Sequence, residues 1–105
     1  MGIFDFLRGP DINQGVKEYE DTAGAVLLDV RTPEEYREGH IPHSKNVPLS
    51  SIGNVKSVVQ KETPVFVYCY SGSRSHQAAG MLEQMGYTKV KNIGGIAAYK
   101  GKVER

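Results

Sequence analysis

The residues best suited to chemistry lie in the stretch VFVYCYSGSRSHQAAGML, which runs from Val65 to Leu82 and contains the chain's only cysteine, Cys69. Small residues follow the cysteine and allow backbone N–H groups to converge on an anion. A helix start adds about half a positive charge, and Arg74 adds a full one. Such surroundings lower a thiol pKa from about 8.5 to roughly 3.5–7.5. A lone cysteine is more often a buried, inert residue, but these neighbours favour a nucleophilic thiolate.

The elements around Cys69 are predicted to be a strand, a tight loop and a helix. The apolar run at 65–68 is typical of a buried strand. Apolar residues then recur at helical spacing from about Arg74 to Met85, and Gly86 supplies a helix stop. Cys69 therefore stands at the carboxyl end of a strand, where open α/β sheets bind their ligands.

The rest of the chain alternates between strands and helices. The continuous apolar run at 25–30 predicts a strand that is covered on both faces, as in a parallel sheet. Shorter extended segments are expected at 46–49 and 90–93, with a turn at Gly94-Gly95. Alternation of this kind predicts a mostly parallel sheet with helices on both faces.

Helix signals fall between these strands. Asn13 is predicted to cap a helix that runs to about Glu20. Thr32, Pro33 and Glu35 form a capping-box pattern for a helix that ends at Gly39. Further helices are expected after Ser50 or Ser51, with Ile52, Val55 and Val59 on one face, and from Ile96 to Tyr99.

Length and composition indicate one soluble globular domain. The chain has 105 residues, a net charge of +1 and 39% hydrophobic residues, which suits a single core. We expect one domain over residues 1–105, with its core at about 11–103 and a short N-terminal arm at 1–10 that packs on the domain or makes a weak contact elsewhere. The balanced charge gives no case for nucleic-acid binding, and no apolar run approaches the ~20 residues of a membrane span.

The cysteine count limits the available chemistry. One cysteine excludes an internal disulfide, a Cys-x-x-Cys redox pair and a cysteine-based zinc site. No other metal-binding or cofactor motif is present, so we expect no cofactor. Any sulfur chemistry at Cys69 must be completed by molecules from outside the chain. A reduced thiol and the absence of a signal-peptide pattern favour the cytoplasm.

Three stretches in order carry a family likeness: LLDVRTPEEYREGHIPHSKNVPL, CYSGSRS and NIGG. With them the chain resembles single-domain rhodanese-like proteins, a sulfurtransferase family, over about 11–103. The resemblance implies a three-layer α/β/α sandwich with a central, mostly parallel sheet.

The resemblance also implies a reaction and a set of site residues. Cys69 is expected to accept a sulfane sulfur from thiosulfate or another anionic persulfide donor, and to pass it to cyanide, a thiol or a protein acceptor. Asp29 and Arg31 match a family pattern and are expected to brace the loop. Glu35 is explained by helix capping, and His40 by a structural turn. The expected substrate-binding residues are those of the loop: Tyr70, Ser71, Gly72, Ser73, Arg74 and Ser75.

Other functions remain open from the sequence. One is a sulfur-carrier or regulatory module whose Cys69 persulfide docks with a partner and turns over poorly. Another is a phosphatase or arsenate reductase, a related branch in which five residues separate the cysteine from the arginine. Here four residues lie between Cys69 and Arg74, which favours a single sulfur atom over a tetrahedral oxyanion. An inactive scaffold is disfavoured by the intact loop.

Overall fold

A computed structural model describes residues 9–105; the first eight residues of the predicted N-terminal arm lie outside the described residues. No helix within 9–105 is long and apolar enough to cross a membrane. The chain order of the elements is α2 (Ile12–Glu20), β1 (Val26–Asp29), α3 (Pro33–Glu38), β2 (Lys45–Asn46), η1 (Leu49–Ser57), β3 (Val65–Cys69), α4 (Ser73–Gln84), β4 (Val90–Gly95) and η2 (Ile96–Ala98), where η denotes a 3₁₀ helix.

Within residues 9–105, four strands form one sheet in the order β2-β1-β3-β4, and every neighbouring pair is parallel. The two central strands are almost wholly buried, as their largely apolar sequences predict. Because parallel strands end at the same edge, the segments that follow β1, β3 and β4 meet there. That edge carries the cysteine loop.

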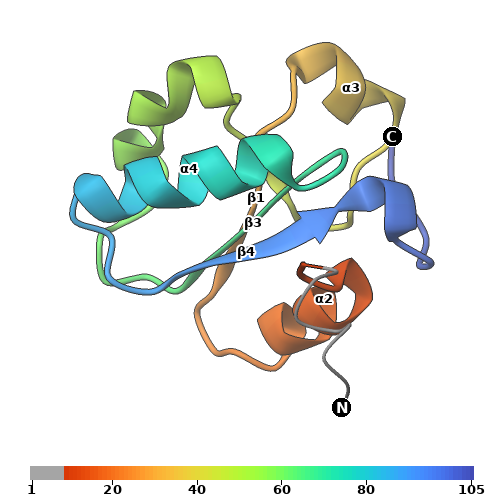
Figure 1. Ribbon diagram of the computed structural model, residues 1–105, viewed down its shortest axis with the longest axis horizontal. Helices are drawn as coiled ribbons and strands as arrows, with labels where there is room; N and C mark the ends of the chain where they lie inside the picture. The colour runs from red at the N-terminus through yellow and green to blue at the C-terminus, as the bar shows by residue number, and fades with distance from the viewer. Residues whose placement is uncertain (1–8) are drawn as a thin grey trace.

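Helices cover both faces of the sheet. Side chains alternate along β3, so that Val65, Val67 and Cys69 pack on one face in a cluster with residues of α4 and η1. Phe66 and Tyr68 pack on the other face with residues of α2. The two coverings are visible on opposite sides of the strands in Figure 1. The predicted three-layer α/β/α architecture is therefore confirmed.

Three observed helix starts differ from the predicted ones. Asp11, and not Asn13, caps α2, because the Asp11 carboxylate accepts a hydrogen bond from the Asn13 backbone N–H at 3.0 Å. Helix α4 begins at Ser73, one residue before the predicted position, after Gly72 in a left-handed conformation with φ of 104°. The helix predicted after Ser50 is a kinked 3₁₀ segment that starts at Leu49.

The last strand is longer than predicted. Gly94-Gly95 is not a turn: β4 continues through both glycines. The pairing of β4 with β3 shifts by one residue beyond Asn92, so that Ile93 has no partner across the ladder. Gly94 has a φ of 105°, which favours glycine. This bulge re-aims the end of β4 toward the cysteine loop.

Candidate active site

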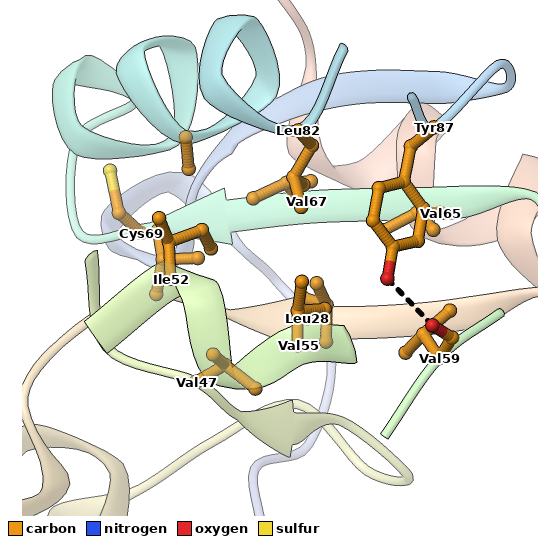
Figure 2. Packing of buried hydrophobic residues seen from close by; sticks show 12 residues of the cluster. Leu28, Val47, Ile52, Val55, Val59, Val65, Val67, Cys69, Leu82 and Tyr87 are labelled. Atoms are coloured by element: carbon orange, nitrogen blue, oxygen red, sulfur yellow. Dashed lines mark hydrogen bonds between the residues drawn. The ribbon is translucent and has the colours of Figure 1, made fainter. Parts of the chain in front are cut away.

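Cys69 ends strand β3, and its side chain is 1% exposed. Figure 2 shows its sulfur pointing toward the first turn of α4. The Gly72 backbone N–H donates a hydrogen bond to Sγ over 3.0 Å. Gly72 can turn this N–H inward because glycine tolerates a positive φ at little cost. The sequence thus places the sulfur where the backbone N–H groups of a loop and a helix start can reach it.

The local hydrogen bonds favour the thiolate form of Cys69. Burial alone raises the pKa of Cys69, but donors from the Ser75 side chain and from the backbone of Ser75, Gly72 and Ser71 outweigh it and leave the pKa below its ordinary value. The Ser75 hydroxyl has one proton, and its shortest contact is to Asn92 Oδ1 at 2.6 Å. The Ser75 hydroxyl can therefore donate its proton to the sulfur or to Asn92, but not fully to both. The backbone N–H donors, in contrast, are held in place by the conformation of the loop.

We predict that Cys69 titrates at lower pH than an unperturbed cysteine, and that Ser75→Ala raises its pKa. Removing the hydroxyl removes a donor that lowers the pKa, so more of the thiol stays protonated at neutral pH. The ultraviolet absorbance of the thiolate, followed against pH, measures this without requiring a reagent to reach the buried sulfur. The matched control is Ser73→Ala, which alters an exposed serine of the same turn. Equal titration of wild type and Ser75→Ala would contradict the prediction.

The end of strand β4 contacts the cysteine loop and holds it in place. Asn92 Oδ1 accepts hydrogen bonds from the Ser75 hydroxyl and from the Gly94 backbone N–H. The Ala97 N–H donates to the Tyr70 carbonyl over 3.0 Å. A Cβ atom on Gly95 would lie only 2.1 Å from the Tyr70 carbonyl oxygen. The NIGG stretch therefore fits directly under the loop, a role that sequence reasoning did not assign to Asn92 or Gly95.

We predict that Gly95→Ala displaces the loop, lowers the stability of the protein and alters the titration of Cys69. The added methyl meets backbone at Tyr70 and Ser71, which cannot rotate away, so overpacking should cost about 1–3 kcal/mol. Chemical denaturation and the Cys69 titration measure the two effects. The control is Gly80→Ala, where a Cβ meets nothing within 4 Å on the same domain and should be tolerated. A stable Gly95→Ala protein with normal Cys69 titration would contradict this role.

Arg74 is held by Glu35, a residue 39 positions earlier in the chain. Its two terminal nitrogens donate to the two carboxylate oxygens over 2.8 and 3.0 Å. The Arg74 guanidinium, followed by smaller effects, lowers the pKa of Glu35 to about 2. The predicted capping box of Thr32 and Glu35 is confirmed. Sequence reasoning missed the second role of Glu35, in which it ties α3 to the start of α4.

Asp29 and Arg31 form a buried ion pair beneath the loop edge. Arg31 donates to both Asp29 oxygens, and also to the Gly39 carbonyl over 2.7 Å. Burial lowers the pKa of Arg31, but the Asp29 carboxylate outweighs it and raises the pKa overall. The pair closes the turn after β1 and fixes the end of α3.

The other predicted loop residues differ in exposure. Tyr70 is 55% exposed and lines two surface cavities of about 500 and 310 Å³. Ser71 and Ser73 are exposed, and Ser75 is fully buried. A third cavity of about 210 Å³ lies beside Arg74. Within 9–105, no three His, Cys, Asp or Glu side chains are placed to hold a metal ion.

His40 and His76 have different surroundings. His40 stacks on Tyr36 with ring centroids 3.8 Å apart, and its backbone N–H donates to the Glu104 carbonyl. These contacts agree with the structural turn expected there. His76 is exposed and lines the cavity of about 500 Å³.

Known proteins are similar to this chain in sequence. An uncharacterised protein of Bacillus subtilis is 37% identical over 106 residues, covering 97% of this chain and 84% of that protein. A sulfurtransferase of Allochromatium vinosum is 42% identical over 80 residues, covering 75% of each chain. A thiosulfate sulfurtransferase of Escherichia coli is 41% identical over 71 residues, covering 66% of this chain and 68% of that protein.

Solved structures show the same fold. A rhodanese from Escherichia coli, solved with anions, superimposes with a TM-score of 0.69 and 35% sequence identity, over 77% of this chain and 98% of that one. The family model of the rhodanese-like domain matches residues 13–102. The family match and the solved structures therefore agree, and the chain belongs to the rhodanese-like domain family.

Proposed function

We propose that this protein is a sulfurtransferase that works through a Cys69 persulfide. The observation that carries the proposal is the Cys69 sulfur at the start of α4, with the Gly72 N–H directed at it and a lowered pKa. Donor, thiolate and persulfide are all anions, so one set of N–H donors stabilises each species in turn. The family relatives named as sulfurtransferases support the same chemistry.

The reaction divides into two displacements. The Cys69 thiolate attacks the outer sulfur of thiosulfate, the bond between the two donor sulfurs breaks, and sulfite leaves with that bonding pair. Cys69 then carries a persulfide with one negative charge. A nucleophile such as cyanide or a thiolate attacks the outer persulfide sulfur, and the Cys69 thiolate is regenerated.

Each predicted site residue has a place in this proposal. The backbone N–H groups between Tyr70 and Ser75 hold the transferred sulfur, and Arg74 contributes to the donor side as far as its pairing with Glu35 allows. Asp29 and Arg31 brace the loop without touching substrate. The acceptor is a small thiophile or a protein thiol that reaches the loop past Tyr70. The reduced thiol suits a reducing compartment such as the cytoplasm.

Steady-state turnover tests the proposal and separates it from the alternatives. Wild type is mixed with thiosulfate and cyanide, and then with thiosulfate and a thiol, while sulfite and thiocyanate formation are followed. Repeated turnover supports an enzyme. One equivalent of sulfite without further turnover supports a sulfur carrier. Absence of any sulfur uptake from thiosulfate, polysulfide or a persulfide would overturn the proposal, and Cys69-dependent hydrolysis of an aryl phosphate would point to the phosphatase branch.

A further inference from the structure

In the described part of the chain, residues 9–105, the positive charge beside the cysteine loop is largely neutralised. The guanidinium groups of these residues that line the cavities next to the loop are those of Arg31 and Arg74. Arg31 is paired with buried Asp29. Arg74 uses both terminal nitrogens on Glu35, and a bidentate pair of this kind is among the stronger charge interactions in proteins. An incoming donor therefore meets an ion pair at Arg74 in place of a full positive charge.

The cavity beside Arg74 has apolar walls. Its volume is about 210 Å³, and Val30, Pro48 and Leu49 line it together with Thr32, Ser50 and the two arginines. Val30 also packs in the same buried cluster as Cys69. The Thr32 hydroxyl is already hydrogen-bonded to Glu35. Arg74, which borders this cavity, also interacts electrostatically with Cys69. A donor held between Arg74 and the sulfur can therefore place a small apolar group in the cavity, which offers little to a second anionic oxygen.

From these two observations we infer that the donor site prefers a monoanionic donor with an apolar substituent, of the thiosulfonate type, over the dianion thiosulfate, and that Glu35 sets this preference by holding Arg74. The inference rests on the proposed sulfurtransferase function. The donor R–SO₂–S⁻ is attacked at its outer sulfur by the Cys69 thiolate, the S–S bond breaks, and the sulfinate R–SO₂⁻ leaves with the bonding pair. Two negative charges are present before and after the step.

A matched pair of donors tests the inference. Methanethiosulfonate differs from thiosulfate by a methyl group in place of one anionic oxygen. The ratio of kcat/KM for thiosulfate to that for methanethiosulfonate is measured in wild type and in Glu35→Gln. Glutamine preserves the capping box. It carries no negative charge, and its amide nitrogen cannot accept a hydrogen bond from the Arg74 guanidinium. In a partly exposed site, the Coulomb energy between two unit charges roughly 5 Å apart corresponds to more than a tenfold change in rate before salt screens it. Arg74 released from Glu35 attracts the dianion thiosulfate more than the monoanion, so the ratio should rise about tenfold in the variant.

The control is Glu34→Gln. Glu34 lies on the same helix and is exposed, and it pairs only loosely with Arg37 over 3.7 Å. Its neutralisation removes the same charge without touching Arg74, so the donor ratio should stay within about twofold of wild type. Thermal melts of both variants establish that each is folded during the assay.

The outcomes are distinct. A wild-type ratio below one that rises in Glu35→Gln but not in Glu34→Gln supports the inference. A wild-type ratio above one, an unchanged ratio in folded Glu35→Gln, or an equal rise in Glu34→Gln overturns it, while transfer from both donors leaves the sulfurtransferase proposal standing. If wild type takes sulfur from neither these donors nor a persulfide, the proposed function itself fails, and this inference fails with it.

Discussion

Replacing Cys69 with serine should abolish sulfur transfer and leave the fold in place. Serine has nearly the same shape, and its oxygen can accept the hydrogen bond that Gly72 N–H donates to the sulfur. A serine hydroxyl, however, stays protonated at neutral pH and cannot carry a transferable sulfane sulfur. We expect turnover to fall by at least about 10³-fold, as for other enzymes that lose their nucleophile.

The fold of the serine variant is the necessary control. Cys69 packs in a cluster with Val30, Val47 and Ile52, so a hydroxyl there should cost no more than about 1–3 kcal/mol, because its hydrogen-bond partner remains available. Chemical denaturation measures that cost, and sulfite release measures activity. Retained turnover in a folded Cys69→Ser protein would show that another group carries the sulfur.

Replacing Asp29 with alanine should produce the largest loss of stability. Asp29 is 0% exposed and Arg31 is 5% exposed, so the substitution leaves a buried guanidinium without its carboxylate. Breaking a buried ion pair in this way costs about 3–5 kcal/mol, out of the roughly 5–15 kcal/mol that stabilises a typical domain. For about 100 residues this lowers Tm by roughly 15 °C or more. Calorimetry or a circular-dichroism melt measures it.

Two companion variants identify the cause of that loss. Glu34→Ala breaks an exposed ion pair of α3 and should change the free energy of unfolding by less than about 0.5 kcal/mol. Asp29→Leu combined with Arg31→Met removes both buried charges and should recover part of the loss. Recovery stays incomplete because the Gly39 carbonyl loses its partner. A Tm of Asp29→Ala within a few degrees of wild type would contradict the assigned bracing role.

The sequence was sufficient to predict the layered fold because its two central strands have an easily recognised apolar pattern. The run at β3 is apolar throughout and the run at β1 is apolar up to Asp29, and only a sheet covered on both faces buries such strands completely. The change from this pattern to helical spacing after Cys69 located the loop within one residue of its observed end. Local signals also identified the Thr32–Glu35 capping box, which is confirmed.

Features that depend on long-range contacts escaped prediction. Glu35 has a complete local explanation as a capping residue. The neighbouring sequence therefore gave no sign of its contact with Arg74, 39 positions away. Gly94 and Gly95 resemble a turn in sequence, but the bulge at the end of β4 extends the strand under the loop. The signal that could have indicated this contact is Asn92 before the paired glycines, since an asparagine can bond its own backbone two residues ahead.

The exposed surface around the loop is predicted less well, both from local sequence signals and from long-range contacts. Tyr70 borders two cavities on the outer side of the loop, and its neighbours Ser71 and Ser73 are suited equally to turns and to anion contacts. The acceptor's identity depends on which molecule can reach the sulfur across this surface. The chemistry of the loop therefore follows from local residues, whereas the choice of partners follows from their arrangement in space.

The most direct test of the central claim is the intact mass of the protein after a single exposure to a sulfane donor. Wild type, once freed of donor, should gain the mass of one sulfur atom per chain, and cyanide or a thiol should remove it. Cys69→Ser should gain nothing under the same conditions. A wild-type mass that stays unchanged with thiosulfate, methanethiosulfonate and a persulfide, or an equal gain in Cys69→Ser, would contradict the account.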